Sequence, residues 1–231
     1  MSGAVGTIIV AAGKGRRVGS DVPKQYLRVA GRPVLAWSLI FFEQRPEVES
    51  IVVVIAPEDA DYCREVMLGH NFTKVAAVVP GGETRQQSVL NGLFALPASK
   101  SELVAVHDAA RPFLDGRLFE RLVRAGREFG AAVPALPVRE TLKATDPEGF
   151  VRSTVPRDSL VATQTPQIFD RELLSIAHLS AREEGFQGTD DASLVEHLGW
   201  KVKVVPGDPR NIKITYPEDI VLAEAFLAAS E

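Results

Sequence analysis

A glycine-rich and basic segment follows the first apolar run of the chain. Its small residues are Ala11, Ala12, Gly13 and Gly15, and its cations are Lys14, Arg16, Arg17 and, a little later, Lys24. Small residues let a backbone approach a phosphate chain closely, and successive N–H groups can then hold the phosphate oxygens. The segment therefore favours a loop that folds over a nucleoside triphosphate, although a solvated basic loop has the same composition.

Two familiar phosphate-binding motifs do not fit this segment. A Walker A loop requires Gly-Lys-Ser or Gly-Lys-Thr at a fixed spacing, which the segment lacks. A dinucleotide fingerprint requires a third glycine where this chain has Val18, and Pro23 interrupts the helix that should follow. A triphosphate would thus be held by lysines, arginines and backbone N–H groups in some other arrangement.

A carboxylate stands at the end of a later apolar run, where Asp108 follows Val106 and His107. A lone carboxylate suits Mg²⁺, which keeps several waters and binds phosphate oxygens alongside few protein ligands. Asp108 could instead cap the next loop, because aspartate commonly bonds nearby backbone N–H groups. Successive side chains of a strand point to opposite faces, so we expect a structural role for His107.

The elements that must position these residues alternate between strand-like and helix-like patterns. Residues 7–11 form an apolar run with β-branched members, whereas Leu35, Leu39 and Phe42 recur with the period of a helix. We predict strands at residues 7–11, 51–56, 75–79, 103–106, 131–136, 163–169 and 201–205. We predict helices at residues 33–44, 59–68, 118–129 and 191–198, with Pro33 in the first helical position of the first one. Three more helices are predicted to start after a capping box at 84–87, at residue 170 and at residue 217.

This alternation is typical of an α/β protein. It predicts a Rossmann-like three-layer α/β/α fold, in which a mostly parallel sheet lies between two layers of helices. The length of 231 residues suits a single domain over residues 1–231.

The alternation is interrupted by one insertion at residues 138–158. Two short extended runs, 141–145 and 150–155, flank a turn at 146–149, which predicts a β-hairpin. A two-stranded hairpin is marginally stable alone in water. We therefore expect its apolar residues, Leu142, Phe150 and Val151, to pack against something, with a second subunit as one option.

Composition narrows the classes of function. The net charge is −4, so no overall basic field would recruit nucleic acid. The single cysteine, Cys63, cannot form a disulfide within the chain, and the apolar run at 7–12 is too short for a signal-peptide core or a membrane span. We expect a cytoplasmic protein that binds neither nucleic acid nor membranes. The four histidines are scattered, which argues against a histidine zinc site.

Several motifs, taken together and in order, resemble the 2-C-methyl-D-erythritol 4-phosphate cytidylyltransferase family. The resemblance spans about residues 8–226, and Glu83 departs from the aspartate that the family often has. The motifs are Ala11-Ala12-Gly13-x-Gly15-x-Arg17, Pro23-Lys24-Gln25-Tyr26, Gly81-Gly82-x-x-Arg85-x-x-Ser88-Val89, Val106-His107-Asp108-Ala109-Ala110-Arg111-Pro112, Pro137-Val138-Arg139-x-Thr141, Thr165-Pro166-Gln167, Thr189-Asp190-Asp191-Ala192-Ser193 and Asn211-Ile212-Lys213-Ile214-Thr215.

The resemblance implies a reaction, a fold and a set of residue roles. It implies transfer of a cytidylyl group from CTP to 2-C-methyl-D-erythritol 4-phosphate, with release of pyrophosphate, in the non-mevalonate route to isoprenoid precursors. It implies a fold like that of nucleotide-diphospho-sugar transferases, Mg²⁺ or another divalent cation on Asp108, and a homodimer formed through the 138–158 arm. The implied catalytic residues are Lys24, Arg17 and Lys213; the implied nucleotide-binding residues are Ala11, Ala12, Gly13, Gly15, Gly81, Gly82 and Ser88; and the implied contacts of the second substrate are Asp108, Arg111, Thr141, Arg157, Thr165 and Thr189.

Three alternative functions stay open. A cytidylyltransferase for ribitol 5-phosphate would share the nucleotide half of the site, including Lys24 and Asp108. An NAD-dependent oxidoreductase is a more distant alternative, because the glycine pattern is broken and the second strand ends at Ala56-Pro57 without an acidic residue for a ribose. A nucleotide-binding regulator without catalysis is the third, although the presence of Lys24, Asp108 and Lys213 together argues against it. Among the implied roles, Arg111 and Thr165 have the strongest structural alternative, because they could simply fix loops.

Overall fold

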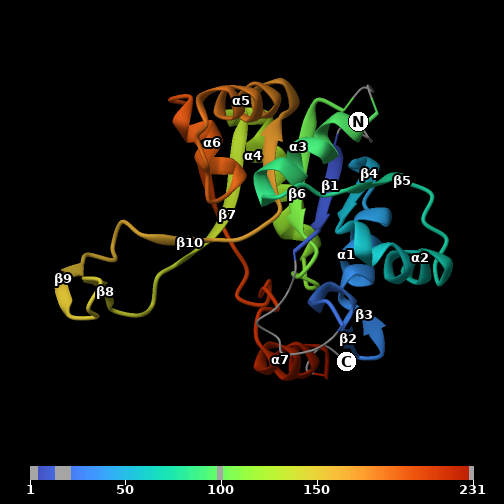
Figure 1. Ribbon diagram of the computed structural model, residues 1–231, viewed down its shortest axis with the longest axis horizontal. Coiled ribbons are helices and arrows are strands. Elements are labelled where there is room, and N and C mark those ends of the chain that lie inside the picture. Colours follow the sequence, from blue (N-terminus) through green and yellow to red (C-terminus); the bar gives the residue numbers. More distant parts are fainter. Residues whose placement is uncertain (1–4, 14–21, 98–100, 229–231) are drawn as a thin grey trace.

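The computed structural model describes residues 5–13, 22–97 and 101–228, and its main feature is a mixed β-sheet (Figure 1). The strands β1, β4, β5 and β6 lie side by side in parallel, and β12 runs parallel to β7, whereas β10 and β11 run antiparallel to their neighbours. The prediction of a mostly parallel sheet is therefore confirmed. The strands of this sheet are β1 (Val5–Ala11), β4 (Val48–Ile55), β5 (Val75–Pro80), β6 (Leu103–Asp108), β7 (Ala131–Pro137), β10 (Val161–Thr163), β11 (Gln167–Asp170) and β12 (Lys203–Pro206).

The register of the central strands brings two predicted site segments together. The strand order is β10-β7-β11-β6-β1-β4-β5, so β1 and β6 are neighbours at its centre. Val10 of β1 lies opposite Asp108 of β6, and the Ala109 N–H donates to the Val10 carbonyl at 3.0 Å. The carboxyl ends of parallel strands meet at one edge of a sheet, where ligands of α/β proteins commonly bind.

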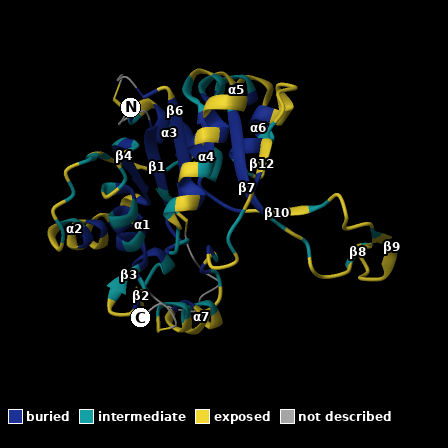
Figure 2. Cartoon of the chain, turned by 180° about the vertical axis from the view of Figure 1, so that it is seen from behind, coloured by how far each residue is buried: buried dark blue, intermediate teal, exposed yellow. Residues whose placement is uncertain are grey.

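Helices cover both faces of the sheet. Consecutive strand residues point to opposite faces, so Ile9 packs in one core with Leu39 and Leu122, while Ile8 packs in another with Val89 and Leu174. Figure 2 shows the buried strands between these helical layers, as the sequence predicted. None of the described helices is both long and apolar enough to span a bilayer. One layer contains α1 (Val34–Glu43), α2 (Ala60–Leu68) and α4 (Gly116–Phe129), and the other contains α3 (Arg85–Ala95), α5 (Arg171–Glu184) and α6 (Asp191–His197).

Two helix starts differ in detail from the prediction. Pro33 is the N-cap of α1 and not its first helical residue. Thr84 caps α3 by accepting from the Gln87 N–H, but the Gln87 side chain accepts from the Glu83 N–H instead of that of Thr84. Only half of the predicted capping box is therefore formed. A complete capping box is found at α6, between Asp190 and Ser193.

The prediction of one strand at residues 163–169 is wrong. Two strands, β10 and β11, are separated by residues 164–166. Pro166 has no N–H to donate to a ladder, and Gln164 uses its side chain to bond the Asp208 and Asn211 carbonyls. The chain therefore leaves the sheet between them.

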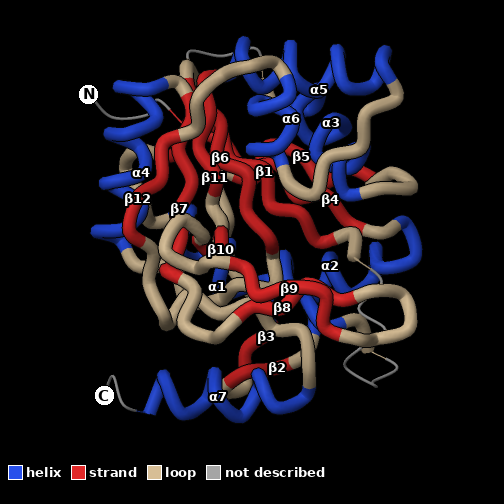
Figure 3. Tube along the Cα trace, turned by 90° about the vertical axis from the view of Figure 1, so that its left-hand side faces the viewer, coloured by secondary structure: helices blue, strands red, loops and turns tan. Residues whose placement is uncertain are grey.

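A small subassembly at one end of the molecule was not predicted. The strands β2 (Arg28–Val29) and β3 (Arg32–Pro33) form a hairpin whose turn residues have positive φ angles, 49° at Ala30 and 73° at Gly31. The last helix, α7 (Pro217–Ala228), lies next to this hairpin, away from the two helical layers (Figures 1 and 3). The two elements share a third buried cluster that contains Val29 and Ala223.

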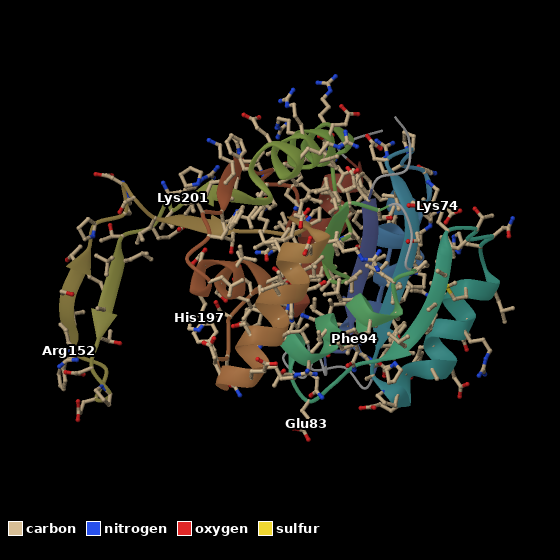
Figure 4. The ribbon with its side chains drawn as sticks, turned by 90° about the horizontal axis from the view of Figure 1, so that it is seen from above. Lys74, Glu83, Phe94, Arg152, His197 and Lys201 are labelled. Carbon is tan, nitrogen blue, oxygen red and sulfur yellow. The ribbon has the colours of Figure 1, made fainter. Side chains whose placement is uncertain are left out.

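The predicted hairpin insertion is present as an arm that projects from the body. It consists of β8 (Leu142–Thr145) and β9 (Val151–Val155), and Figure 4 shows Arg152 at its far end. Phe150 and Val151 are 71% and 60% exposed, so the expected packing of these residues does not occur within the chain.

Candidate active site

A cavity of about 280 Å³ lies where β1 and β6 end. Three segments from distant parts of the sequence form most of its wall: the end of β1, the turn between β5 and α3, and the end of β6. The residues that line it are Val10, Ala11, Ala12, Gly13, Lys24, Gln25, Gly82, Glu83, Thr84, Arg85, Ser88, Asp108, Ala109, Ala110 and Lys213. Most of the residues predicted for the nucleotide half of the site therefore share one wall.

Lys24 reaches the cavity on a short 3₁₀ helix, η2 (Lys24–Tyr26). The next residue, Gln25, is 2% exposed, and its Nε2 donates to the Ala11 carbonyl at 2.8 Å and to Asp59 Oδ2 at 2.9 Å. Asp59 belongs to a second 3₁₀ helix, η3 (Pro57–Asp59). The buried amide of Gln25 thus ties the turn that carries Lys24 to the end of β1.

The turn between β5 and α3 is closed by Ser88. Its hydroxyl accepts from the Gly82 N–H at 3.0 Å and donates to the Thr84 carbonyl at 2.9 Å. Gly81 permits close packing, because a Cβ built on it would lie 2.4 Å from the Ala12 Cβ, which real side chains do not tolerate. The two segments predicted to bind the nucleotide are therefore packed against each other.

Asp108 stands between two cations. Lys213 Nζ lies 2.6 Å from Oδ2, and Arg85 Nε lies 3.2 Å from Oδ1. Burial alone would raise the pKa of Asp108, but Arg85 and Lys213 hold it well below its usual range. Asp108 is thus an anion at neutral pH, and the Lys213 side chain beside it is 40% exposed.

A hydrogen-bonded chain behind Asp108 fixes the end of β6. His107 Nε2 lies 3.0 Å from the Arg111 carbonyl, which can only accept, so Nε2 carries the proton. His107 Nδ1 then accepts from the Thr165 hydroxyl at 3.1 Å, and that hydroxyl accepts from the Asp108 N–H at 3.0 Å. Burial lowers the pKa of His107 to about 4, in agreement with this neutral form.

These contacts give Thr165 and Arg111 structural roles in the chain as it stands. Neither residue lines the cavity. Arg111 donates to the Asn211 carbonyl at 2.7 Å, and the Asn211 amide donates to the Thr165 carbonyl at 2.8 Å. The loop that carries Lys213 is held in this way. The role of Thr165 and Arg111 as contacts of a second substrate stays a prediction.

Of the remaining predicted contacts of the second substrate, Asp108 lines the cavity, whereas Thr141, Arg157 and Thr189 lie outside it. Thr141 and Arg157 are exposed residues at the base of the arm, where Arg157 donates to the Arg139 carbonyl. Thr189 is exposed just before α6. Gly15 and Arg17 fall outside the described residues. The cavity therefore corresponds to the nucleotide half of the predicted site.

Sequence reasoning missed two residues of the cavity, Arg85 and Gln25. Both stand inside motifs that carried the family resemblance, but neither was given a role. Arg85 contacts Asp108 and also Asp191, whose Oδ2 lies 2.7 Å from the Arg85 NH1. Their position within the motifs was the one signal available, because their partners are distant in the sequence.

The donor set of the cavity fits a metal ion only in part. Over the described parts of the chain, no three His, Cys, Asp or Glu side chains converge on one point. Both oxygens of Asp108 face cations, and Figure 4 shows the side chain of Glu83 pointing away from the body. Mg²⁺ keeps several waters and takes phosphate oxygens as ligands. The site thus suits a cation that arrives with a triphosphate better than one held by the protein alone.

Comparison with known proteins points to one family. A sequence model of the 2-C-methyl-D-erythritol 4-phosphate cytidylyltransferase family matches residues 5–229. The 2-C-methyl-D-erythritol 4-phosphate cytidylyltransferase of Desulforamulus reducens is 46% identical over 226 residues, which are 97% of this chain and 96% of the relative.

Solved structures agree with this similarity. The 4-diphosphocytidyl-2C-methyl-D-erythritol synthase of Anaerococcus prevotii has a TM-score of 0.84 at 36% identity, covering 98% of this chain and 96% of its own. The 2-C-methyl-D-erythritol 4-phosphate cytidylyltransferase of Thermus thermophilus has a TM-score of 0.78 at 39% identity, covering 99% of this chain and 100% of its own. The similarity therefore spans both the core and the segments that form the cavity.

Proposed function

The chain belongs to the 2-C-methyl-D-erythritol 4-phosphate cytidylyltransferase family, and on this premise we propose that it transfers a cytidylyl group from CTP to 2-C-methyl-D-erythritol 4-phosphate. The products are 4-diphosphocytidyl-2-C-methyl-D-erythritol and pyrophosphate, and the reaction serves the non-mevalonate route to isoprenoid precursors. The observation that carries the proposal is the convergence of Lys24 and Lys213 on a cavity that contains the Asp108 carboxylate. Family membership also argues against the NAD-dependent alternative.

The chemistry is an in-line displacement at the α-phosphorus of CTP. A phosphate oxygen of the acceptor forms the new bond to phosphorus, and the bond to the bridging oxygen of pyrophosphate breaks. Such a transfer needs alignment and compensation of negative charge, and it needs no covalent protein nucleophile. A cavity with two lysines and a fixed backbone meets these needs.

Lys24 is proposed to stabilise charge on the α-phosphate. Its turn is held from behind by the buried amide of Gln25, so little reorganisation is needed when the substrate arrives. Lys213 is proposed to leave its ion pair with Asp108 and to bind a phosphate oxygen of the substrate. Its partly exposed side chain allows this change of partner. Arg17 is proposed as a further cation for the triphosphate.

The nucleotide is proposed to lie between two backbone segments. Ala11 ends β1, and Ala12 and Gly13 follow it; among the described residues nothing lies within 4 Å of a Cβ built on Gly13, so phosphate oxygens can approach the backbone closely here. The turn at Gly82 and Ser88 is proposed to recognise the cytosine edge through its backbone carbonyls, because the Ser88 hydroxyl and the Gly82 N–H already bond to each other within the turn.

A divalent cation, with Mg²⁺ as the first choice, is proposed to accompany the triphosphate. Asp108 is the residue that would hold it, together with phosphate oxygens and water. When bound, the ion would neutralise charge on the phosphates. When Lys213 leaves Asp108 Oδ2, that oxygen would become accessible to the ion.

The acceptor half of the site is proposed to be completed by a second copy of the chain. Thr141 and Arg157 lie at the base of an arm that projects away from the body, and Phe150 and Val151 near its tip are exposed. A partner that receives the arm would cover these apolar residues and bring the two polar ones to its own cavity. Such an exchange makes a symmetric homodimer with two equivalent sites.

Pyrophosphate release from CTP tests the function directly. The purified protein is incubated with CTP and either 2-C-methyl-D-erythritol 4-phosphate or ribitol 5-phosphate, each with Mg²⁺ or with a chelator. We expect release with methylerythritol phosphate and Mg²⁺ only. Release with ribitol 5-phosphate alone would reassign the acceptor, and no release with either acceptor would refute the cytidylyltransferase proposal.

A further inference from the structure

A second buried carboxylate lies behind Asp108. Asp191, at the start of α6, is completely buried, and its Oδ2 lies 2.7 Å from the Arg85 NH1. The same guanidinium reaches Asp108 through Nε at 3.2 Å. Arg85 thus joins the start of α3, the start of α6 and the end of β6 through one rigid, planar group.

Asp191 is itself fixed from two directions. His178 of α5, also completely buried, lies with Nε2 3.1 Å from Asp191 Oδ1. The side chain of Gln167 holds the start of α6, since it donates to Asp190 Oδ2 at 2.7 Å and accepts from the Ala192 N–H at 3.1 Å. Because the Asp191 carboxylate is held in this way, the Arg85 guanidinium that it binds has little freedom to change its orientation.

Lys213 supplies part of the positive charge that compensates the two carboxylates, and Arg111 also lowers the pKa of Asp108 from nearby. Two carboxylates, Asp108 and Asp191, face the one guanidinium of Arg85, and Lys213 supplies a second positive charge. Burial would lower the pKa of Arg85, but the two carboxylates raise it above its ordinary value, so Arg85 stays charged. If Lys213 leaves for a phosphate oxygen, Arg85 remains as a partner of Asp108.

We propose that Arg85, braced by Asp191 and His178, is a positioning residue of the transfer reaction, which holds the Asp108 carboxylate in place and thereby lets Lys213 move to the substrate phosphates. This inference rests on the proposed function. Asp191 acts on the reaction through Arg85, since it lies behind the guanidinium and does not line the cavity. The bracing, and not the charge of Arg85 alone, sets the orientation of Asp108.

A double-mutant cycle tests this chain of contacts. The variants are Asp191→Asn, Arg85→Gln and the double variant, each measured for kcat and for the KM of CTP in pyrophosphate release. We expect Asp191→Asn to lower kcat about 10- to 100-fold, with the KM of CTP changed by less than about threefold. In the Arg85→Gln background, adding Asp191→Asn should lower kcat by less than about twofold, because the guanidinium through which Asp191 acts is already absent.

Two further variants separate bracing from charge and from folding. Arg85→Lys keeps the charge but cannot span two carboxylates, so its kcat should stay close to that of Arg85→Gln. Arg64→Gln removes an arginine from an exposed ion pair with Asp61 and should leave kcat unchanged. If Asp191→Asn alone does not fold, the double variant compared with Arg85→Gln still measures the effect of Asp191→Asn once Arg85 is gone, and Arg85→Lys compared with Arg85→Gln still separates bracing from charge.

The outcomes distinguish this inference from the proposed function. A wild-type protein that releases no pyrophosphate would refute the function. An active wild type whose kcat is unchanged by Asp191→Asn would refute the inference alone. Additive losses in the cycle, or full kcat in Arg85→Lys, would also overturn it, since either result would mean that Asp191 does not act through Arg85.

Discussion

The two cations that face Asp108 differ in how easily they can leave. The Lys213 side chain is 40% exposed, whereas the Arg85 side chain is 28% exposed and is held on its far side by Asp191. An exposed ammonium can exchange one anionic partner for another at low cost, because water and ions screen the pair in either state. The site therefore contains one fixed and one exchangeable positive charge at the same carboxylate.

The Lys24 ammonium at the cavity wall should contribute strongly to kcat. Lys24→Ala removes a cation placed at the cavity wall, and loss of one such electrostatic group typically lowers kcat by about 10²–10³-fold. Steady-state pyrophosphate release measures the effect. The control is Lys201→Ala, which removes an exposed lysine outside the cavity and should leave kcat unchanged. Equal activity of the two variants would exclude a catalytic role for Lys24.

Burial of His107 should make the stability of the protein depend on pH. Its pKa is lowered from 6.5 to about 4 by burial, so the folded state resists a proton that the unfolded state accepts. The neutral His107 therefore contributes to the free energy of unfolding above pH 6.5, and this contribution is lost as the pH falls towards 4. Between pH 7 and pH 5 the free energy of unfolding should fall by about 2 kcal/mol. Urea unfolding at these two pH values should show the loss in the wild type and a smaller loss in His107→Gln. The idea fails if both proteins lose the same amount.

The sequence predicts single residues well when their chemistry is local. Lys24 and Asp108 stand in a basic glycine-rich loop and at the end of a strand, which are recognisable patterns, and the family resemblance then singled out Lys24 among the cations of the loop. Arg85 was not given a role, because one of the two carboxylates that it contacts, Asp191, is 106 positions away in the sequence. Only the fold shows that one guanidinium serves two carboxylates.

At the scale of elements, the packing of β1 against the turn before α3 depends on Gly81. Gly81→Ala would place a Cβ 2.4 Å from that of Ala12 and 2.9 Å from Ser88 Oγ, so one of the two segments must move. Overpacking of this kind costs about 1–3 kcal/mol of unfolding free energy. We also expect a higher KM for CTP, because both displaced segments line the cavity.

The matched control for this substitution is Gly69→Ala at the end of α2. There the added Cβ would have its nearest neighbour at 3.6 Å, an ordinary contact, and φ is −73°. In thermal unfolding, the melting temperature of Gly69→Ala should therefore stay close to that of the wild type, and that of Gly81→Ala should be clearly lower. Equal melting temperatures would show that the turn is more compliant than the packing indicates.

Elements with a long apolar run or a clear helical period were predicted from the sequence. The strands β1 and β4 and the helices α1 and α4 belong to this group. The failures share a cause, which is that tertiary contacts override the local pattern. Residues 164–166 leave the sheet because Gln164 bonds to distant carbonyls, and the short hairpin of β2 and β3 is stabilised by packing against α7.

At the scale of the whole molecule, the arm is the feature that the single chain does not explain. Phe150 and Val151 are largely exposed, although an apolar hairpin tip in water gains nothing from its side chains. Thr141 and Arg157 at the arm base are exposed as well. The sequence predicted the hairpin from its turn residues, but it could not show that the hairpin would stand apart from the body.

A heterodimer experiment tests whether the arm serves a partner. In the proposed dimer, Lys24→Ala damages the cavity and Arg157→Ala damages the arm, so each homodimer should be nearly inactive. If each arm completes the cavity of the other copy, a heterodimer of the two variants has one site with both defects and one intact site. Heterodimers purified through two different tags should then have about half the activity of the wild-type dimer. If each arm serves its own cavity, both sites carry one defect and the heterodimer is as inactive as the homodimers, which would refute the exchange.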